Sequence, residues 1–173
     1  DALERSYAEA EDVPSYVDWH HLHNLHLYGM ALVHEGLLDD AGAVLREAFE
    51  TPGQNAIPEV FGHIPYLEYL LHAGRYVEAL ERANELAETH GPTGEVMGRV
   101  FACEALLSLN RTDEAAAVGV EVASLAASLG ERISGPNAAF AVRQARSFDA
   151  QVDGELMLHS PDPSMLYTAE RRL

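Results

Sequence analysis

The feature that most constrains the fold of this chain is a tight turn that occurs three times. The turns read HEGLLDDAG, HAGRYVEAL and SLNRTDEAA, and Gly36, Gly74 and Asn110 occupy the same place in each. Glycine and asparagine tolerate the left-handed backbone conformation that ends a helix. The turn residues are 38 (74 minus 36) and 36 (110 minus 74) positions apart, a period typical of stacked helix–turn–helix units. The spacing therefore predicts an all-α chain folded as an α-solenoid.

The segments between the turns carry the hydrophobic period of helices. In VEALERANELAE, from Val77 to Glu88, small and apolar residues fall on one stripe, with Glu and Arg opposite. Pro and Gly mark the breaks between helical segments. These breaks predict three helix pairs over residues 15–53, 54–92 and 93–130. A half-repeat helix over 1–14 precedes them, and a capping helix over 131–154 and a tail over 155–173 follow.

The repeated unit resembles a known family. GRYVEALERANELAETHGP, from Gly74 to Pro92, is similar to the second half of a tetratricopeptide repeat (TPR). Ala41, Ala79 and Ala115 each follow the turn residue by five positions and match the small residue of that family where two helices approach closely. The resemblance covers roughly residues 18–129 and implies a right-handed TPR-like superhelix of three helix pairs. HNLHLY and GHIPYL also resemble the HNxHFL and HMP motifs of some bacterial TPR-type proteins.

Composition excludes several classes of function. The net charge is −17, which disfavours binding to nucleic acid or to an anionic membrane surface. All basic residues are arginine, so the chain has neither a Schiff-base lysine nor a P-loop lysine. Its single cysteine, Cys103, allows no intrachain disulfide, as in a cytoplasmic protein. No apolar run is long enough to span a membrane. Because the chain starts at Asp1 without Met, we expect a piece of a longer protein.

Histidines gather in one predicted helix. The stretch from Asp18 to His34 holds five of the nine histidines, and His23, His26, Met30 and His34 share one helix face. The TPR resemblance implies that this face lines a concave groove. Alignment on the turn residues extends the groove to the later repeats. The predicted lining is His23, His26, Met30, Val33 and His34; Phe61, Ile64, Glu68, Leu71 and His72; and Met97, Val100, Glu104, Leu107 and Ser108.

Three hypotheses account for the histidines. In the first they only pack and hydrogen-bond between helices, and alignment places His63 in such a packing position. In the second the groove binds a peptide or protein partner, because Met and aromatic side chains adapt to apolar partners. Since the groove has no Arg, the acidic peptides that TPR grooves bind through Lys and Arg are not expected. In the third, His23 and His26 bind a divalent metal such as Zn together with Glu68, His72 or Glu104.

Sequence signatures of catalysis are absent. There is no His-Glu-x-x-His, no G-x-S-x-G and no GxGxxG, and Cys103 is expected to pack as an inert hydrophobic residue. The sequence therefore predicts a non-catalytic TPR-like scaffold without a cofactor, which binds a protein or peptide partner in an apolar, His/Met-lined groove. The alternative is a metal-binding protein or metal-dependent enzyme centred on His23 and His26.

Overall fold

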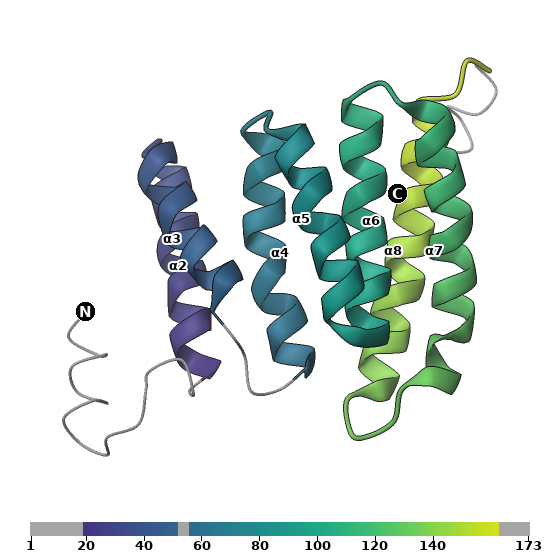
Figure 1. Ribbon diagram of the computed structural model, residues 1–173, viewed down its shortest axis with the longest axis horizontal. Coiled ribbons are helices and arrows are strands. Elements are labelled where there is room, and N and C mark those ends of the chain that lie inside the picture. Colours follow the sequence, from purple (N-terminus) through teal and green to yellow (C-terminus); the bar gives the residue numbers. More distant parts are fainter. Residues whose placement is uncertain (1–18, 52–55, 163–173) are drawn as a thin grey trace. The chain divides into compact units, whose positions relative to one another are not determined.

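The computed structural model describes residues 19–51 and 56–162, with no side-chain description for 19–20 and 56–61. The described residues form seven α-helices and no strand (Figure 1). This confirms the all-α class; the half-repeat over 1–14 and residues 163–173 of the tail lie outside the described ranges. The helices are α2 (Trp19–His34), α3 (Leu38–Glu50), α4 (Ala56–His72), α5 (Tyr76–Thr89), α6 (Gly91–Ser108), α7 (Thr112–Arg132) and α8 (Ala138–Leu158).

The chain divides into two compact units. Unit 1 is Asp1–Tyr69 and unit 2 is Leu70–Leu173. Helix α4 contributes to both, because its last turn, residues 70–72, belongs to unit 2. Within unit 1, α2 packs on α3; within unit 2, α5 packs on α6, α6 on α7, and α8 on both α6 and α7.

The three turns have the left-handed conformation that the sequence predicts. Gly36, Gly74 and Asn110 have φ values of +77°, +72° and +58°. In each turn, the N–H of this residue donates to the carbonyl three positions earlier, and the next N–H donates to the carbonyl five positions before it, with N···O distances of 2.8–3.1 Å. These two bonds define the Schellman motif, which pairs backbone groups that a helix end leaves without a partner.

The small residue after each turn is buried where two helices meet. Ala41, Ala79 and Ala115 are all 0% exposed, and each donates its N–H to the carbonyl of the residue that follows the turn residue. Three turns with the same hydrogen bonds and the same buried alanine show that one local structure recurs with the spacing of the sequence pattern.

Unit 1 has an aromatic core between α3 and α4. The ring of Phe49 lies edge-on to His63, with centroids 4.4 Å apart, and 5.4 Å from the ring of Tyr66. His63 is only 4% exposed, which confirms the interpretation of this histidine as a packing residue. Two hydrogen bonds extend the core. Arg46 Nε donates to the Tyr66 hydroxyl, and the Tyr69 hydroxyl donates to the carbonyl of Leu38, each over 2.9 Å.

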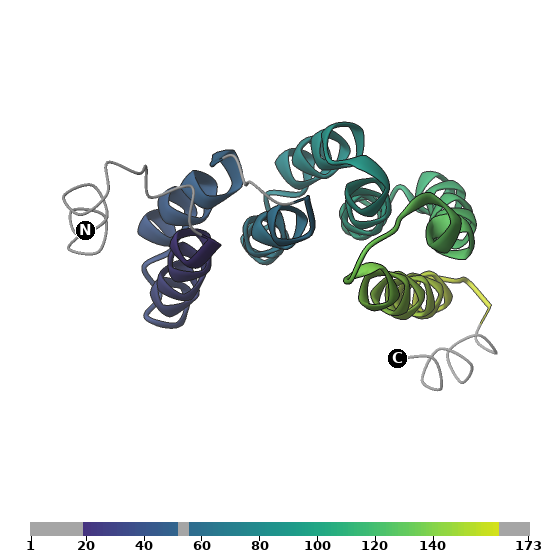
Figure 2. The ribbon, with the colours of Figure 1, turned by 90° about the horizontal axis from the view of Figure 1, so that it is seen from below.

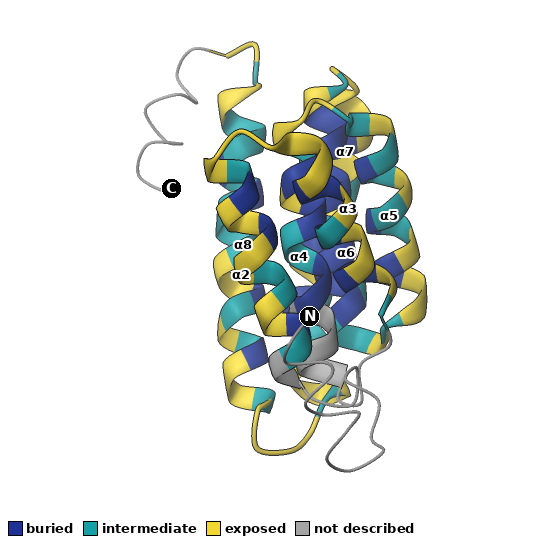
Figure 3. Cartoon of the chain, turned by 90° about the vertical axis from the view of Figure 1, so that its left-hand side faces the viewer, coloured by how far each residue is buried: buried dark blue, intermediate teal, exposed yellow. Residues whose placement is uncertain are grey.

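Unit 2 is organised around α6. Eleven of the 18 residues of this helix are buried, because α5, α7 and α8 all pack against it (Figures 1 and 2). Figure 3 colours the described helices by burial, with the buried positions in dark blue. Val100, Cys103 and Leu106 of α6 share one apolar cluster with Val122 of α7 and Val152 of α8. A helix that is apolar on nearly every side needs such neighbours.

Helix α8 corresponds to the capping helix expected over 131–154. Gly135, with φ +106°, and Pro136 separate it from α7, and Asn137 is its N-cap. Pro lacks a backbone N–H and is tolerated where a helix begins. The helix continues to Leu158, four residues beyond the predicted end, and this extension contributes to the pocket described below.

Candidate functional site

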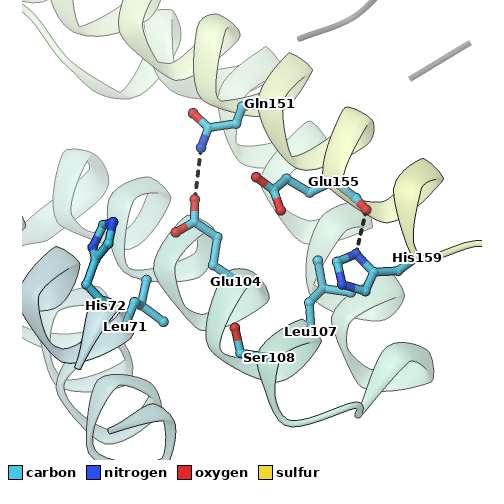
Figure 4. A pocket seen from close by; sticks show the side chains of 8 residues that line it. All are labelled: Leu71, His72, Glu104, Leu107, Ser108, Gln151, Glu155 and His159. Carbon is cyan, nitrogen blue, oxygen red and sulfur yellow. Dashed lines mark hydrogen bonds between the residues drawn. The ribbon is translucent and has the colours of Figure 1, made fainter. Parts of the chain in front are cut away.

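A pocket of about 250 Å³ lies within unit 2. It is formed by side chains from the last turn of α4, from the C-terminal half of α6 and from the C-terminal part of α8 (Figure 4). Its apolar side chains are leucines, and its polar ones are two carboxylates, two imidazoles, an amide and a hydroxyl. The lining residues are Leu71, His72, Glu104, Leu107, Ser108, Gln151, Glu155 and His159.

Helix α6 supplies the floor and one carboxylate. Glu104, Leu107 and Ser108 are three and four positions apart, so they share one face of the helix. Leu107 is buried and belongs to the core cluster of unit 2, whereas Glu104 is half-buried and Ser108 is exposed. The pocket therefore has an apolar floor that continues into the core and polar groups at its rim.

Helix α8 supplies a second polar face. Gln151, Glu155 and His159 are four positions apart and so lie along one stripe. Gln151 Nε2 donates to Glu104 Oε1 over 3.0 Å and thereby links α8 to α6. His159 Nδ1 donates to the backbone carbonyl of Glu155, also over 3.0 Å. In a neutral imidazole, this bond makes the other ring nitrogen, Nε2, a hydrogen-bond acceptor.

The carboxylates of the pocket affect the pKa of the buried Cys103 thiol. Cys103 is fully buried, and Sγ donates to the carbonyl of Ala115 over 3.5 Å. Burial, and to a smaller extent the negative charges of Glu104 and Glu155, together raise the pKa of this thiol to about 12. The thiol therefore stays protonated and is a poor nucleophile. This confirms the expectation that Cys103 packs as an inert residue, and it shows that both carboxylates act on the same region.

The structure brings part of the predicted groove together. Leu71, His72, Glu104, Leu107 and Ser108, which the repeat alignment assigned to the groove, all line the pocket. The alignment was wrong for two neighbouring residues. Met97 is 2% exposed and Val100 is 1% exposed, so their side chains lie in the core and are not open to a ligand. For Val100 the reason is α8, which packs on α6 and places Val152 in the same cluster.

The groove residues of unit 1 lie mostly at its surface. On α2, His23, Met30 and His34 are exposed and Val33 is half-buried; on α4, Glu68 is exposed and Ile64 is half-buried. The side chain of Phe61 lies outside the described residues. The histidine stripe of α2 is therefore largely a surface feature.

His26 is the member of this stripe that has a defined structural role. Its side chain is half-buried, and Nε2 lies 2.7 Å from the carbonyl of Gly62, so it donates a hydrogen bond from α2 to α4. Burial lowers the pKa of His26; the bond to Gly62 opposes that shift, and the neighbouring His23 adds to it. Pro65, one turn after Gly62, lies inside α4 and lacks a backbone donor. His26 thus connects the two helices near this proline.

Sequence reasoning missed the three pocket residues from α8 and its C-cap. Gln151, Glu155 and His159 lie beyond the last repeat, so alignment on the turn residues assigned them no place. Their spacing of four was a usable signal, because it places polar side chains on one stripe of the final helix. Glu155 and His159 fell outside the expected helix, which ended at residue 154.

The described residues offer no group of three or more His, Cys, Asp or Glu side chains that could hold a metal ion. The ligand set of His23, His26, Glu68 and His72 therefore stays a prediction. Among the described residues, no helix has both the length and the apolar character that crossing a membrane needs. No family model matches the sequence, and no match is found among curated proteins or solved structures.

Proposed function

We propose that the chain is a TPR-like scaffold, a right-handed superhelix of helix pairs, that binds a peptide or a segment of a partner protein. The pocket of unit 2 is one recognition site of this scaffold. The exposed stripe of His23, Met30 and His34 on α2 is a second recognition site, which belongs to unit 1. The proposal concerns binding, and the one thiol of the chain, which is buried and protonated, takes no part in it.

The repeated turns support the architecture. Three Schellman turns with the same hydrogen bonds, each followed by a fully buried alanine, are what a helical repeat array requires at every junction. In such arrays each unit contacts its neighbours, and the stacked helices present an extended surface to ligands.

The observation that carries the proposal is the composition of the pocket. Five of its eight lining residues come from positions that the repeat alignment assigned to a ligand groove. The alignment used only the turn residues, so it is independent of the side chains that meet in the pocket. At about 250 Å³, the cavity is smaller than the roughly 300–1,000 Å³ of most small-molecule sites. This size favours one side chain of a polypeptide over a whole small-molecule ligand.

A selection from a random peptide library tests the proposal. The best peptide, labelled with fluorescein, is titrated with the protein and with a Ser108→Trp variant, and binding is followed by fluorescence polarisation. Ser108 is exposed at the end of α6, so the indole fills the pocket without entering the core. We expect the dissociation constant to rise at least about tenfold, which corresponds to roughly 1.4 kcal/mol.

The matched control is Ser124→Trp, which adds the same side chain at an exposed position of α7 outside the pocket. It should leave the affinity unchanged, and circular dichroism should show the same helix content in all three proteins. Equal affinity for the protein and its Ser108→Trp variant would remove the pocket from the proposal, and failure to select any peptide would contradict the scaffold function itself.

A further inference from the structure

The pocket of unit 2 is rich in hydrogen-bond acceptors and negative charge. We propose, resting on the function above, that it receives an arginine or lysine side chain of the partner polypeptide. The cationic head group would lie between Glu104 and Glu155, and its aliphatic stem would lie against Leu71 and Leu107.

The two carboxylates of the pocket face a common space. They come from facing helices, Glu104 from α6 and Glu155 from α8. Both charges act on the thiol of Cys103, and Figure 4 shows both carboxylates directed into the space between these helices. Two carboxylates in one pocket attract a cation and repel an acidic ligand.

Glu104 is held in place before any ligand arrives. The Gln151 amide donates to one of its oxygens over 3.0 Å. An ionised carboxylate has about four acceptor sites, so this bond orients the group and leaves it able to accept from a ligand. Pre-oriented groups lose less conformational entropy on binding.

His159 adds a further hydrogen-bond acceptor to the pocket. Nε2 of a neutral His159 is an acceptor because Nδ1 donates to the backbone. Acceptors on both α6 and α8 suit a ligand that consists of donors, and a guanidinium offers five N–H groups while an ammonium offers three. The stems of Arg and Lys are apolar and pack along hydrophobic surface, which Leu71 and Leu107 provide.

The pocket is not lined by arginine or lysine. The eight lining residues include neither Arg nor Lys. Elsewhere in the described part of unit 2, arginines pair with glutamates outside the pocket, at Arg75–Glu78, Arg82–Glu85, Arg99–Glu121, Arg111–Glu114 and Arg132–Glu95. The lining of the pocket thus contains two carboxylates and no Arg or Lys side chain. With a net charge of −17, the whole chain also attracts basic segments from a distance.

The test uses two small probes that differ in charge. N-acetyl-arginine methylamide carries the guanidinium, and N-acetyl-citrulline methylamide is its neutral counterpart of nearly the same shape. Each is titrated into the isotope-labelled full chain while NMR follows the side-chain amide of Gln151, which contacts Glu104. We expect saturable shifts of this signal with the arginine probe and at least about tenfold weaker binding of the citrulline probe.

Two double variants locate the effect. Glu104→Gln/Glu155→Gln should weaken binding of the arginine probe at least about tenfold. Glu88→Gln/Glu131→Gln changes the net charge by the same amount at two exposed positions outside the pocket and should leave binding unchanged. An equal response to both probes, an equal loss in both double variants, or no shift of Gln151 would overturn the inference. If Glu104→Gln/Glu155→Gln fails to fold, the difference in affinity between the arginine and citrulline probes for the unmodified protein still tests the inference.

The library selection separates this inference from the proposed function. Selected peptides should contain Arg or Lys, and replacement of that residue by citrulline or by glutamine should abolish binding. If selected peptides lack a basic residue and still lose affinity in Ser108→Trp, the scaffold function stands and the cationic specificity is wrong. If no peptide is selected, the scaffold function fails, whatever the probes show.

Discussion

Units 1 and 2 both place glycines where helices meet, but these glycines face different atoms. In unit 1, a Cβ added at Gly29 would lie 2.5 Å from Leu45 Cγ, and one added at Gly42 would lie 2.5 Å from the hydroxyl of Tyr69. Both obstacles are side chains that can rotate. Unit 1 therefore uses glycine to make room for large side chains of a neighbouring helix.

In unit 2, Gly119 likewise faces a side chain, that of Leu156, but at Gly98 the obstacle is backbone. A Cβ added at Gly98 would lie 2.6 Å from the backbone nitrogen of Ala87 and closer still to the carbonyl oxygen of Ala83. Helices α5 and α6 thus approach each other closely enough to place main chain against main chain. A backbone neighbour cannot rotate away, so a substitution at Gly98 has to separate two helices.

The two units also differ in the polar groups of their cores. Buried or half-buried rings and hydroxyls of unit 1 make defined hydrogen bonds, from Tyr69 to Leu38 and from His26 to Gly62. The core clusters of unit 2 consist of Ala, Val, Leu, Ile and Phe side chains with one cysteine. The comparison teaches that rings and hydroxyls with hydrogen bonds belong to the core of unit 1, whereas the core clusters of unit 2 are apolar apart from Cys103. The polar link from Gln151 to Glu104 in unit 2 lies outside those clusters.

The largest effect should come from Gly98→Ala. The new methyl group overlaps the backbone of α5, and overpacking of a core costs about 1–3 kcal/mol. Because backbone cannot rotate away, we expect the upper end, a loss of about 3 kcal/mol in the free energy of unfolding, despite a gain of about 1 kcal/mol in helix propensity. Urea denaturation followed by circular dichroism measures the total. Hydrogen exchange should show lost protection in α5 and α6 and none lost in α2 and α3.

The matched variant is Gly29→Ala, where the obstacle is the side chain of Leu45. We expect a loss of only about 1 kcal/mol, because rotation of the leucine relieves part of the overlap. If Gly29→Ala cost as much as Gly98→Ala, the proposed difference between side-chain and backbone obstacles would be wrong.

The second effect in size should come from Tyr69→Phe. It removes the hydroxyl that donates to the carbonyl of Leu38 over 2.9 Å and leaves that carbonyl without this donor. Loss of such a bond costs about 1 kcal/mol. Tyr76→Phe in α5 is the control, since Tyr76 is half-buried and the same atom is removed there. A smaller cost for Tyr69→Phe than for Tyr76→Phe, measured by urea denaturation, would contradict the role assigned to the Tyr69 hydroxyl.

The turns were predictable from sequence because their causes are local. Only Gly and Asn adopt the left-handed conformation at little cost in free energy. The Schellman hydrogen bonds span only three and five positions. The same register then placed Leu71, His72 and Glu104 on a common surface. The backbone of the turns could therefore be predicted from sequence, whereas the same register wrongly assigned the buried Met97 and Val100 to the groove.

The packing of α8 was not predictable from the repeats. This helix has no counterpart in the repeat pattern, so the period could not show that it packs on α6. Its position explains both errors in the site. It buries Val100 beside Val152, and it brings Gln151 next to Glu104. Only the three-dimensional packing of the last helix supplies that information.

The smallest effect should appear in the pH dependence of His26→Gln. Burial lowers the pKa of His26 below its ordinary value of 6.5, so the unfolded chain binds this proton more readily than the folded protein does. Linkage then requires stability to fall as the pH decreases from about 6.5 through the lower pKa of the folded state. Gln carries an amide donor for the carbonyl of Gly62 but does not titrate. The loss of stability on acidification should therefore be smaller in His26→Gln than in the unmodified protein.

Urea denaturation across this pH range measures the difference, with His34→Gln as the control. His34 is exposed on the same helix, so its replacement should leave the pH dependence unchanged. Identical pH profiles for His26→Gln and the unmodified protein would show that His26 does not link proton binding to the packing of α2 on α4. A reduced slope in His26→Gln alone would assign this part of the acid sensitivity to unit 1, as the contrast between the two cores predicts.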